Sequence, residues 1–271
     1  MSRLLIKPQL PDEEGRVLCI TPESAGWDYV GYEMFELAPG QKLITDTGDR
    51  EACLVLIEGI ADVSSRDSDW RSIGGRMSVF ENIPPYAVYV PSEDSFEVTA
   101  ISELKLGVCW APGSGTLPAR LISPDMVGVE IRGEGSTRRL VHNILPESEA
   151  ADSLLVVEVL TPNGNWSSYP PHKHDRDLLP EESLLEETYY FKTRPEQGFA
   201  IQRVYTDDGS LDETLAVGSG EAVLVPRGYH PVSAPPGYDV YYLNVMAGPT
   251  RTWKFCNDPK HAWLMPAPAP K

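Results

Sequence analysis

The chain has 271 residues, 41% of them hydrophobic, and a formal net charge of −17 at neutral pH. This length and apolar content suffice for one large or two small folded units with a real core, which excludes wholesale disorder. The negative charge argues against a nucleic-acid partner, because binding to phosphates needs a positive face. It is compatible with a small anionic substrate, provided that a few arginines gather in one pocket.

Nothing in the sequence indicates export or a membrane partner. It contains no run of about 18 apolar residues, so we expect no membrane span. The opening stretch MSRLLIKPQLPDEEG lacks the apolar block and the small-residue cleavage site of a signal peptide. The four cysteines, Cys19, Cys53, Cys109 and Cys256, form no CxxC pair and are typical of buried free thiols. We therefore predict a cytoplasmic protein.

Short apolar stretches, rich in β-branched and aromatic residues and bounded by glycine or proline, follow one another along the chain. Such stretches predict β-strands, and no long segment has a helical period. The predicted class is all-β, with jelly-roll barrels or sandwiches as the architecture. The predicted strands lie at residues 52–59, 86–91, 104–110, 154–160, 188–192, 199–205, 222–228 and 240–246.

Three landmarks recur at nearly constant spacing, which indicates an internal duplication. They are Glu51 with Glu187, Pro91 with Pro226, and Trp110-Ala-Pro112 with Ala247-Gly-Pro249, at offsets of 136, 135 and 137 residues. We therefore predict two tandem jelly-roll units, residues 1–130 and 131–271, with the boundary in the loop-like stretch 115–150. Unpaired edges of such sheets often pair between subunits, so we also expect a homo-oligomer.

The first half lacks metal-binding chemistry. Thr45 and Thr47 stand where a His-x-His pair would precede Glu51, and the stretch SEDSF after Pro91 contains no histidine. We predict that this half is a scaffold or an interface without a metal site.

The second half concentrates three of the five histidines of the chain. His172 and His174 are two residues apart, so on a strand both point to one face. With Glu187 and His230 they form a candidate four-ligand site for one divalent ion. Imidazole nitrogens and a carboxylate suit Zn, Mn, Fe or Ni. Glu186 remains a rival to Glu187, because the long insert after His174, DRDLLPEESLLEE, must loop out before Glu187 rejoins the sheet.

Side chains alternate between the two faces of a strand, and this alternation indicates which other residues of the second half could line the site. Tyr189 shares the face of Glu187, and Tyr242 shares a face with Asn244, so both phenols are candidates for proton transfer or substrate contact. Gln202 and Arg203 face opposite ways, so only one of them can enter the barrel. The other candidates for binding a sugar acid are Arg227, beside His230, and Lys173. An arginine suits a carboxylate well, whereas Lys173 lies opposite the two histidines and is expected at the surface.

The pattern of His172, His174 and a later glutamate, followed by Gly220-Glu-Ala-Val-Leu-Val-Pro226-Arg-Gly228 and His230, resembles the two motifs of the cupin superfamily. The duplication makes the chain similar to a bicupin. The spacing departs from the usual motif: twelve residues separate His174 from Glu187, where three or four are common, and seven rather than five separate Gly164 from His172. One residue, not two, separates Gly228 from His230.

Five longer strings resemble the 5-deoxy-glucuronate isomerase family of myo-inositol breakdown: GNWSSYPPHKHD, EETYYFK, GFAIQRVYTDDGSLDET, VLVPRGYHPV and YYLNVMAGPTRTWKFCNDPKHAW. The resemblance implies an aldose–ketose isomerase that converts 5-deoxy-D-glucuronate to 2-deoxy-5-keto-D-gluconate, with a divalent ion stabilising an enediolate. Three alternatives stay open at this point. They are a ketol-isomerase of another uronate, a non-haem iron dioxygenase, and a sugar-binding or storage cupin without catalysis.

Overall fold

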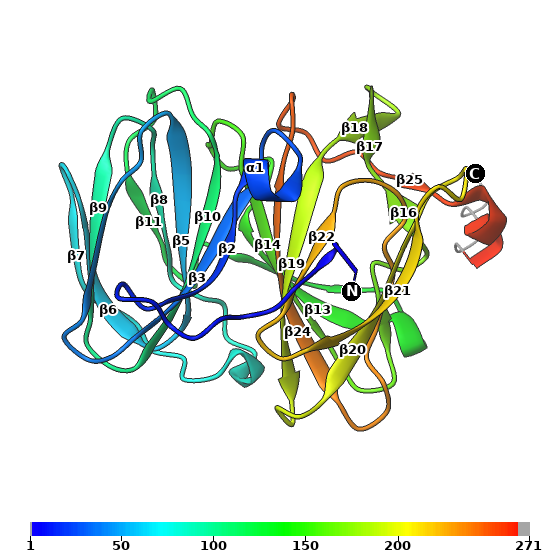
Figure 1. The fold of residues 1–271 in the computed structure, drawn as a ribbon, viewed down its shortest axis with the longest axis horizontal. Helices are drawn as coiled ribbons and strands as arrows, with labels where there is room; N and C mark the ends of the chain where they lie inside the picture. Colours follow the sequence, from blue (N-terminus) through cyan, green and yellow to red (C-terminus); the bar gives the residue numbers. More distant parts are fainter. Residues whose placement is uncertain (1, 265–271) are drawn as a thin grey trace.

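The structure, a computed structural model, describes residues 2–264 and consists almost entirely of antiparallel β-strands (Figure 1). Its helices are short, in agreement with the absence of a helical period in the sequence. They are α1 (Pro22–Ala25), η1 (Val79–Glu81), η2 (Gly135–Thr137) and η3 (Pro259–Leu264). The all-β prediction is confirmed.

The first unit, on the left of Figure 1, packs a six-stranded sheet on a four-stranded sheet. The larger sheet has the order β11 (Arg120–Ile122), β8 (Ala87–Val90), β5 (Arg50–Glu58), β10 (Leu104–Pro112), β3 (Gly31–Leu37), β2 (Arg16–Ile20). The smaller sheet has the order β4 (Lys42–Asp46), β9 (Ser95–Ala100), β6 (Ile60–Ser65), β7 (Asp69–Gly74). Side chains from both sheets, among them Leu54, Phe96 and Val98, fill the space between them.

The second unit repeats this plan with a seven-stranded and a four-stranded sheet. The larger sheet has the order β1 (Leu5–Ile6), β22 (Ala222–Val225), β19 (Glu186–Arg194), β24 (Asp239–Ala247), β14 (Leu155–Thr161), β13 (Arg139–Leu145), β12 (Gly128–Arg132). The smaller sheet has the order β15 (Trp166–Ser167), β23 (Val232–Ser233), β20 (Phe199–Tyr205), β21 (Asp212–Gly218). Two small ladders complete the unit: β16 (His172–Lys173) with β25 (Cys256–Asn257), and β17 (Asp175–Leu178) with β18 (Glu182–Leu184).

The strand orders of the two units correspond one to one, as a duplication requires: β8-β5-β10-β3-β2 matches β22-β19-β24-β14-β13. The register corrects one sequence landmark. Ala52 is opposite Val90, and Glu187 is opposite Val225; each valine precedes the proline of its repeat. Ala52 is therefore the counterpart of Glu187, and Glu51 is the counterpart of Glu186. One residue of slip along a strand reverses the face, so this shift decides which glutamate can enter a barrel.

Both of these glutamates, Glu51 and Glu186, join the two units instead of entering a barrel. The carboxylate of Glu186 accepts hydrogen bonds from three consecutive backbone N–H groups, residues 28–30, at 2.7, 2.7 and 2.9 Å. The carboxylate of Glu51 accepts from residues 152–154 at 2.8, 2.6 and 2.6 Å. Through one glutamate, each unit thus binds a segment of the other unit. Glu186 binds the segment before β3 of the first unit, and Glu51 binds the segment before β14 of the second.

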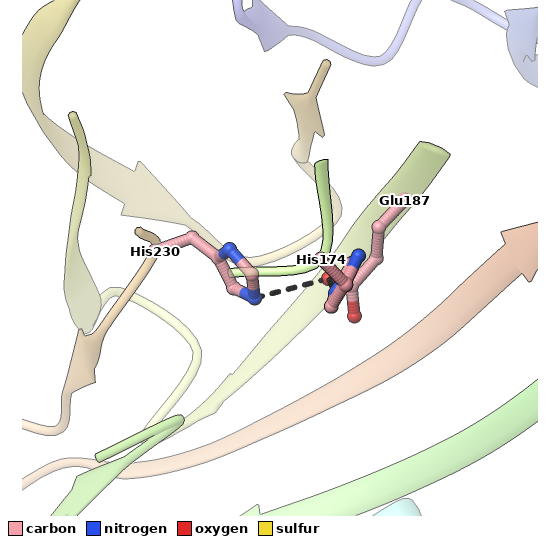
Figure 2. A group of neighbouring side chains, drawn as sticks. All are labelled: His174, Glu187 and His230. Atoms are coloured by element: carbon pink, nitrogen blue, oxygen red, sulfur yellow. Dashed lines mark hydrogen bonds and ion pairs between the residues drawn. The ribbon is translucent and has the colours of Figure 1, made fainter. Parts of the chain in front are cut away.

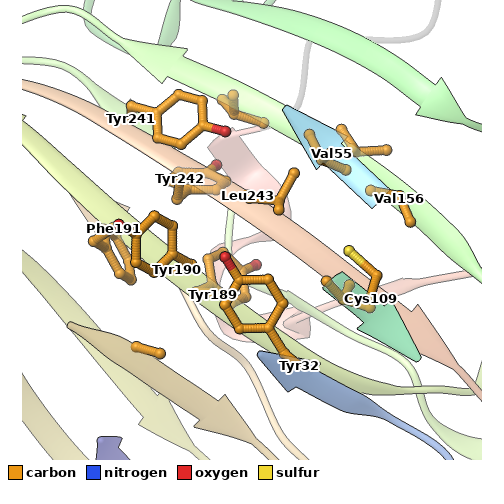
Figure 3. Packing of buried hydrophobic residues seen from close by; sticks show 14 of the residues in the cluster. Tyr32, Val55, Cys109, Val156, Tyr189, Tyr190, Phe191, Tyr241, Tyr242 and Leu243 are labelled. Carbon is orange, nitrogen blue, oxygen red and sulfur yellow. The ribbon is translucent and has the colours of Figure 1, made fainter. Parts of the chain in front are cut away.

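The large sheets of the two units also share one apolar core. Figure 3 shows Tyr32 and Cys109 of the first unit beside Tyr190 and Leu243 of the second, and all belong to one buried cluster. In addition, the N-terminal strand β1 crosses over and pairs with β22 (Figure 1). The chain passes from the first large sheet to the second between β11 and β12. The boundary at residue 130 stays a proposal for where separately folding units would meet.

The interior of the first unit is apolar at the positions that carry polar groups in the second. Ala52 and Leu54 stand where Glu187 and Tyr189 stand on β19, and both are fully buried in the first core. Within residues 2–264, the only group of ligand-type side chains close enough to share an ion lies in the second unit.

Candidate metal centre

Three of the predicted ligands converge inside the second unit. His174 follows β16, Glu187 is the second residue of β19, and His230 precedes β23. The insert between His174 and Glu187 folds back on itself as the β17–β18 hairpin, which brings the two residues together despite their unusual spacing. One ligand atom from each residue lies within 4.8 Å of the others (Figure 2). All three side chains are at most 2% exposed.

One carboxylate oxygen links the two imidazoles. Glu187 Oε2 lies 3.2 Å from His174 Nε2 and 3.2 Å from His230 Nε2 (Figure 2). The second of these contacts lacks hydrogen-bond geometry, so His230 Nε2 is a buried nitrogen without a hydrogen-bond partner. A buried polar atom without a partner is costly. A divalent cation among the three side chains would satisfy it, so the donor set fits such an ion.

The other ring nitrogen of each histidine is held by the backbone. His174 Nδ1 lies 3.1 Å from the carbonyl oxygen of Leu185, and His230 Nδ1 lies 2.9 Å from that of Gly228. A carbonyl oxygen can only accept, so Nδ1 carries the proton and Nε2 is left bare toward Glu187 in the neutral ring. Outer hydrogen bonds of this kind fix the tautomer of metal-binding histidines.

His172 lies at the edge of this group. Its ring centroid is 5.0 Å from that of His230 and 6.4 Å from that of His174. Its Nδ1 is 3.4 Å from the carbonyl oxygen of Pro170, a longer version of the same arrangement. The side chain falls outside the set of atoms that lie within 4.8 Å of one another. It stays a prediction as the fourth ligand.

Burial keeps two of the imidazoles neutral. Desolvation lowers the pKa of His172 and of His230 to about 3. The charge of Glu187 opposes this effect at His230, and the neighbouring imidazoles add to it. Burial also lowers the pKa of His174, but its hydrogen bond and charge interaction with Glu187 outweigh this, so its pKa is raised. Neutral imidazole is the form that binds a metal ion.

These shifts predict how the stability of the metal-free protein changes with pH. An unfolded histidine has a pKa of 6.5, so below that value the unfolded chain binds more protons than the folded His230 does. The contribution of His230 to the free energy of unfolding should therefore fall as the pH decreases from 6.5 toward 3. We expect His230→Asn to make this fall shallower when melting temperature is measured against pH after chelation. An equal slope in both proteins would contradict the assignment.

Two tyrosines pack beside the imidazoles on the inner face of the sheet. The ring centroid of Tyr189 is 5.8 Å from that of His230 and 5.0 Å from that of Tyr242. The hydroxyl of Tyr189 is 3.0 Å from Ser168 Oγ. Burial raises the pKa of both phenols, for Tyr189 well above 10. Both hydroxyls therefore hold their protons at neutral pH.

The predicted amide contacts lie inside the barrel. Gln202 is fully buried, while its neighbour Arg203 is exposed, which settles which of the pair enters. Gln202 Oε1 and Asn244 Nδ2 are buried without a hydrogen-bond partner. Asn244 is opposite Tyr189 in the β19–β24 ladder and so shares its face.

The structure does not bring the three predicted cations to the imidazoles. Arg203 pairs with Asp212 at 2.8 Å on the outside, because it alternates with the inward Gln202. Arg227 is exposed, in the turn before His230, and contacts Ser210. Lys173 alternates with the two histidines, as expected, but it is buried rather than on the surface.

Lys173 instead forms ion pairs on the side of its strand that faces away from the imidazoles. Its ammonium lies 2.7 Å from Asp175 Oδ1 and 3.1 Å from Asp207 Oδ2. The other oxygen of Asp175 accepts a hydrogen bond from the backbone N–H of Gly228 at 2.8 Å. This network connects the segment that carries His174 to the turn that carries His230.

Sequence reasoning missed two arginines near the site, Arg132 and Arg139. They lie on β12 and β13, which lack the long apolar run of the predicted strands. The alternation of apolar and polar residues in Gly128–Arg132 favours a strand there, but no pattern in Arg139–Leu145 indicates that the two arginines lie opposite each other.

Two jelly-roll units in one chain, with clustered histidines and a glutamate in the second, define a bicupin with a candidate site for a divalent metal ion. Solved structures agree on the fold. Oxalate decarboxylase from Lactobacillus farciminis superposes with a TM-score of 0.65 at 12% identity, over 98% of this chain and 91% of that one. The Bacillus subtilis oxalate decarboxylase, described with Mn(II) centres, superposes with a TM-score of 0.62 at 13% identity, over 95% of this chain and 80% of that one.

The chain belongs to the KduI/IolB family, whose model matches residues 4–264. A 5-deoxy-glucuronate isomerase from Geobacillus kaustophilus is 64% identical over 98% of this chain and 96% of its own length. The enzyme of that name from Bacillus subtilis strain 168 is 50% identical over 98% and 99%. The crystal structure of an IolB-like protein from Salmonella typhimurium LT2 has a TM-score of 0.94 and 53% identity, over 97% and 99%. The resemblance seen in the sequence is confirmed. Within residues 2–264, no helix is long and apolar enough to span a membrane.

Proposed function

We propose that this chain isomerises 5-deoxy-D-glucuronate to 2-deoxy-5-keto-D-gluconate in the cytoplasm, with one divalent ion held by His172, His174, Glu187 and His230. Support for the reaction comes from relatives of that name, 64% and 50% identical over nearly the whole chain. The observation that supports the metal is the buried, unpartnered Nε2 of His230 beside Glu187. A homo-oligomer stays a prediction.

The reaction moves a proton between adjacent carbons and another between their oxygens. A divalent ion at this site would polarise the carbonyl and stabilise the negative charge that develops on the two substrate oxygens. The ion could be Zn, Mn, Fe or Ni. The protein must do the rest: orient the sugar acid, exclude water and carry the protons.

The side chains on the inner face suit those tasks. Tyr189 and Tyr242 keep their protons at neutral pH, so either phenol can donate a proton to a substrate oxygen. The unpaired amide atoms of Gln202 and Asn244 can bind sugar hydroxyls, because one offers an acceptor and the other a donor. Burial of the whole set restricts water, which strengthens these interactions.

The reaction can be tested with purified protein and 5-deoxy-D-glucuronate. We expect conversion to the ketose with deuterium uptake from D₂O at the carbon next to the carbonyl, loss of activity after chelation, and recovery with a divalent ion. Other uronates and an oxygen electrode serve as controls. Conversion that survives full metal removal would contradict the metal's role. Binding without exchange, or oxygen consumption, would contradict the isomerase assignment.

A further inference from the structure

Two arginines lie side by side on the inner face of the second barrel. Arg132 and Arg139 are directly opposite each other in the β12–β13 ladder. Val141, two residues after Arg139, is opposite Val159 of β14, and Val159 is opposite Tyr242. Residues opposite each other share a face, and so do residues two apart. Both arginines therefore lie on the same face of the large sheet as Tyr242.

This arrangement places two positive charges together with one nearby negative charge. Arg132 binds Glu130 Oε1 through Nε at 2.9 Å and through Nη2 at 2.5 Å. Arg139 donates to the carbonyl oxygen of Thr137 at 2.9 Å and has no carboxylate partner within residues 2–264. Like charges directly opposite in a ladder are destabilising. Arg139 is also only partly exposed, and burial lowers its pKa.

Two aromatic rings connect Arg132 to His172, at the edge of the candidate metal centre. The guanidinium of Arg132 lies 5.4 Å from the ring centroid of Trp253, whose ring is 6.4 Å from that of Phe255. Phe255 in turn is 4.7 Å from the ring of His172.

We propose that Arg139, assisted by Arg132, binds the carboxylate of the sugar acid. This inference rests on the proposed function. It assigns the preference for a sugar acid over a neutral sugar to these two arginines. The carbonyl and the carboxylate are at opposite ends of a six-carbon uronate, so a second anchor away from the imidazoles is needed. A guanidinium suits it because it binds a carboxylate through two parallel hydrogen bonds. The substrate carboxylate would supply the second negative charge that the two arginines lack. The chain as a whole carries a net charge of −17, so this positive pair differs from the rest of the protein.

The first test uses the wild-type protein. D-glucuronate and D-glucuronamide are compared as competitive inhibitors of the isomerisation; they differ in the charge of one group. We expect the acid to bind at least about 10-fold more tightly, since a hydrogen bond to a charged group has about that effect. Equal inhibition constants would overturn the proposal whether or not any variant folds.

The second test replaces Arg139 by glutamine, with Arg138→Gln as the matched control. Arg138 is the exposed neighbour and loses the same charge. We expect Arg139→Gln to raise KM for 5-deoxy-glucuronate by about 10- to 100-fold and to abolish the preference for glucuronate, with metal content unchanged. Arg139→Lys should recover part of the preference. Unchanged KM, or equal loss of acid and amide binding, would refute the carboxylate site. If the wild-type protein isomerises nothing, the proposed function fails instead.

Discussion

Glu187→Gln is expected to remove the metal ion and lower turnover by more than about 100-fold, because the carboxylate is the one anionic donor in the buried triad. The neighbouring substitution, Glu186→Gln, is the matched control. Glu186 faces the first unit and accepts three backbone hydrogen bonds there. That variant should keep its metal and its kcat while losing about 1–3 kcal/mol of stability.

The two variants are separated by metal analysis of the purified proteins, kcat and chemical unfolding. Because the residues are adjacent and the substitutions identical, differences in expression or general acidity cannot produce opposite results. Metal retained by Glu187→Gln and lost by Glu186→Gln would show that the rival glutamate is the ligand.

Arg76→Met is expected to destabilise the protein by about 3–5 kcal/mol, which is typical of breaking a buried ion pair by removing one partner. Arg76 in the first unit binds Glu158 in the second through two hydrogen bonds of 2.7 and 2.8 Å. The same carboxylate also accepts from Tyr241 at 2.9 Å and contacts His142 Nδ1 at 2.6 Å. Burial raises the pKa of Glu158, but Arg76 lowers it more, to about 2. Without Arg76, this charge would be buried between the two units with too few partners.

Arg194→Met is the control for this prediction. Arg194 pairs with Asp239 at 2.6 Å, but its side chain is 56% exposed, so we expect a loss below about 1 kcal/mol. Urea unfolding of both variants measures the difference. Similar losses would show that the Arg76–Glu158 pair does not hold the two units together.

The fold and the three-residue centre could be predicted from local patterns. Strand alternation places His172 and His174 on one face, and the repeat spacing indicates two similar units. The same alternation cannot tell which face is inward. It therefore could not decide whether Glu186 or Glu187, and whether Gln202 or Arg203, points into the barrel. Those choices depend on the register of β19 and β20 with their neighbours, which only the folded sheets define.

Long-range contacts account for what the sequence did not reveal. Lys173 was expected at the surface because it lies opposite the two histidines, yet Asp175, Glu182 and Asp207 surround its ammonium. Arg132 and Arg139 come from strands without an apolar run, and Arg132 is connected to His172 through Trp253 and Phe255, more than a hundred residues away in the chain. Neither arrangement has a local signature.

The most direct measurement of the central claim is an anomalous-difference map from a crystal of the metal-loaded protein, with data on both sides of the absorption edge of the metal found by elemental analysis. We expect one peak per chain, among the Nε2 atoms of His172, His174 and His230 and the carboxylate of Glu187. A peak at another place, or a fully active crystal without a peak among these side chains, would contradict the account.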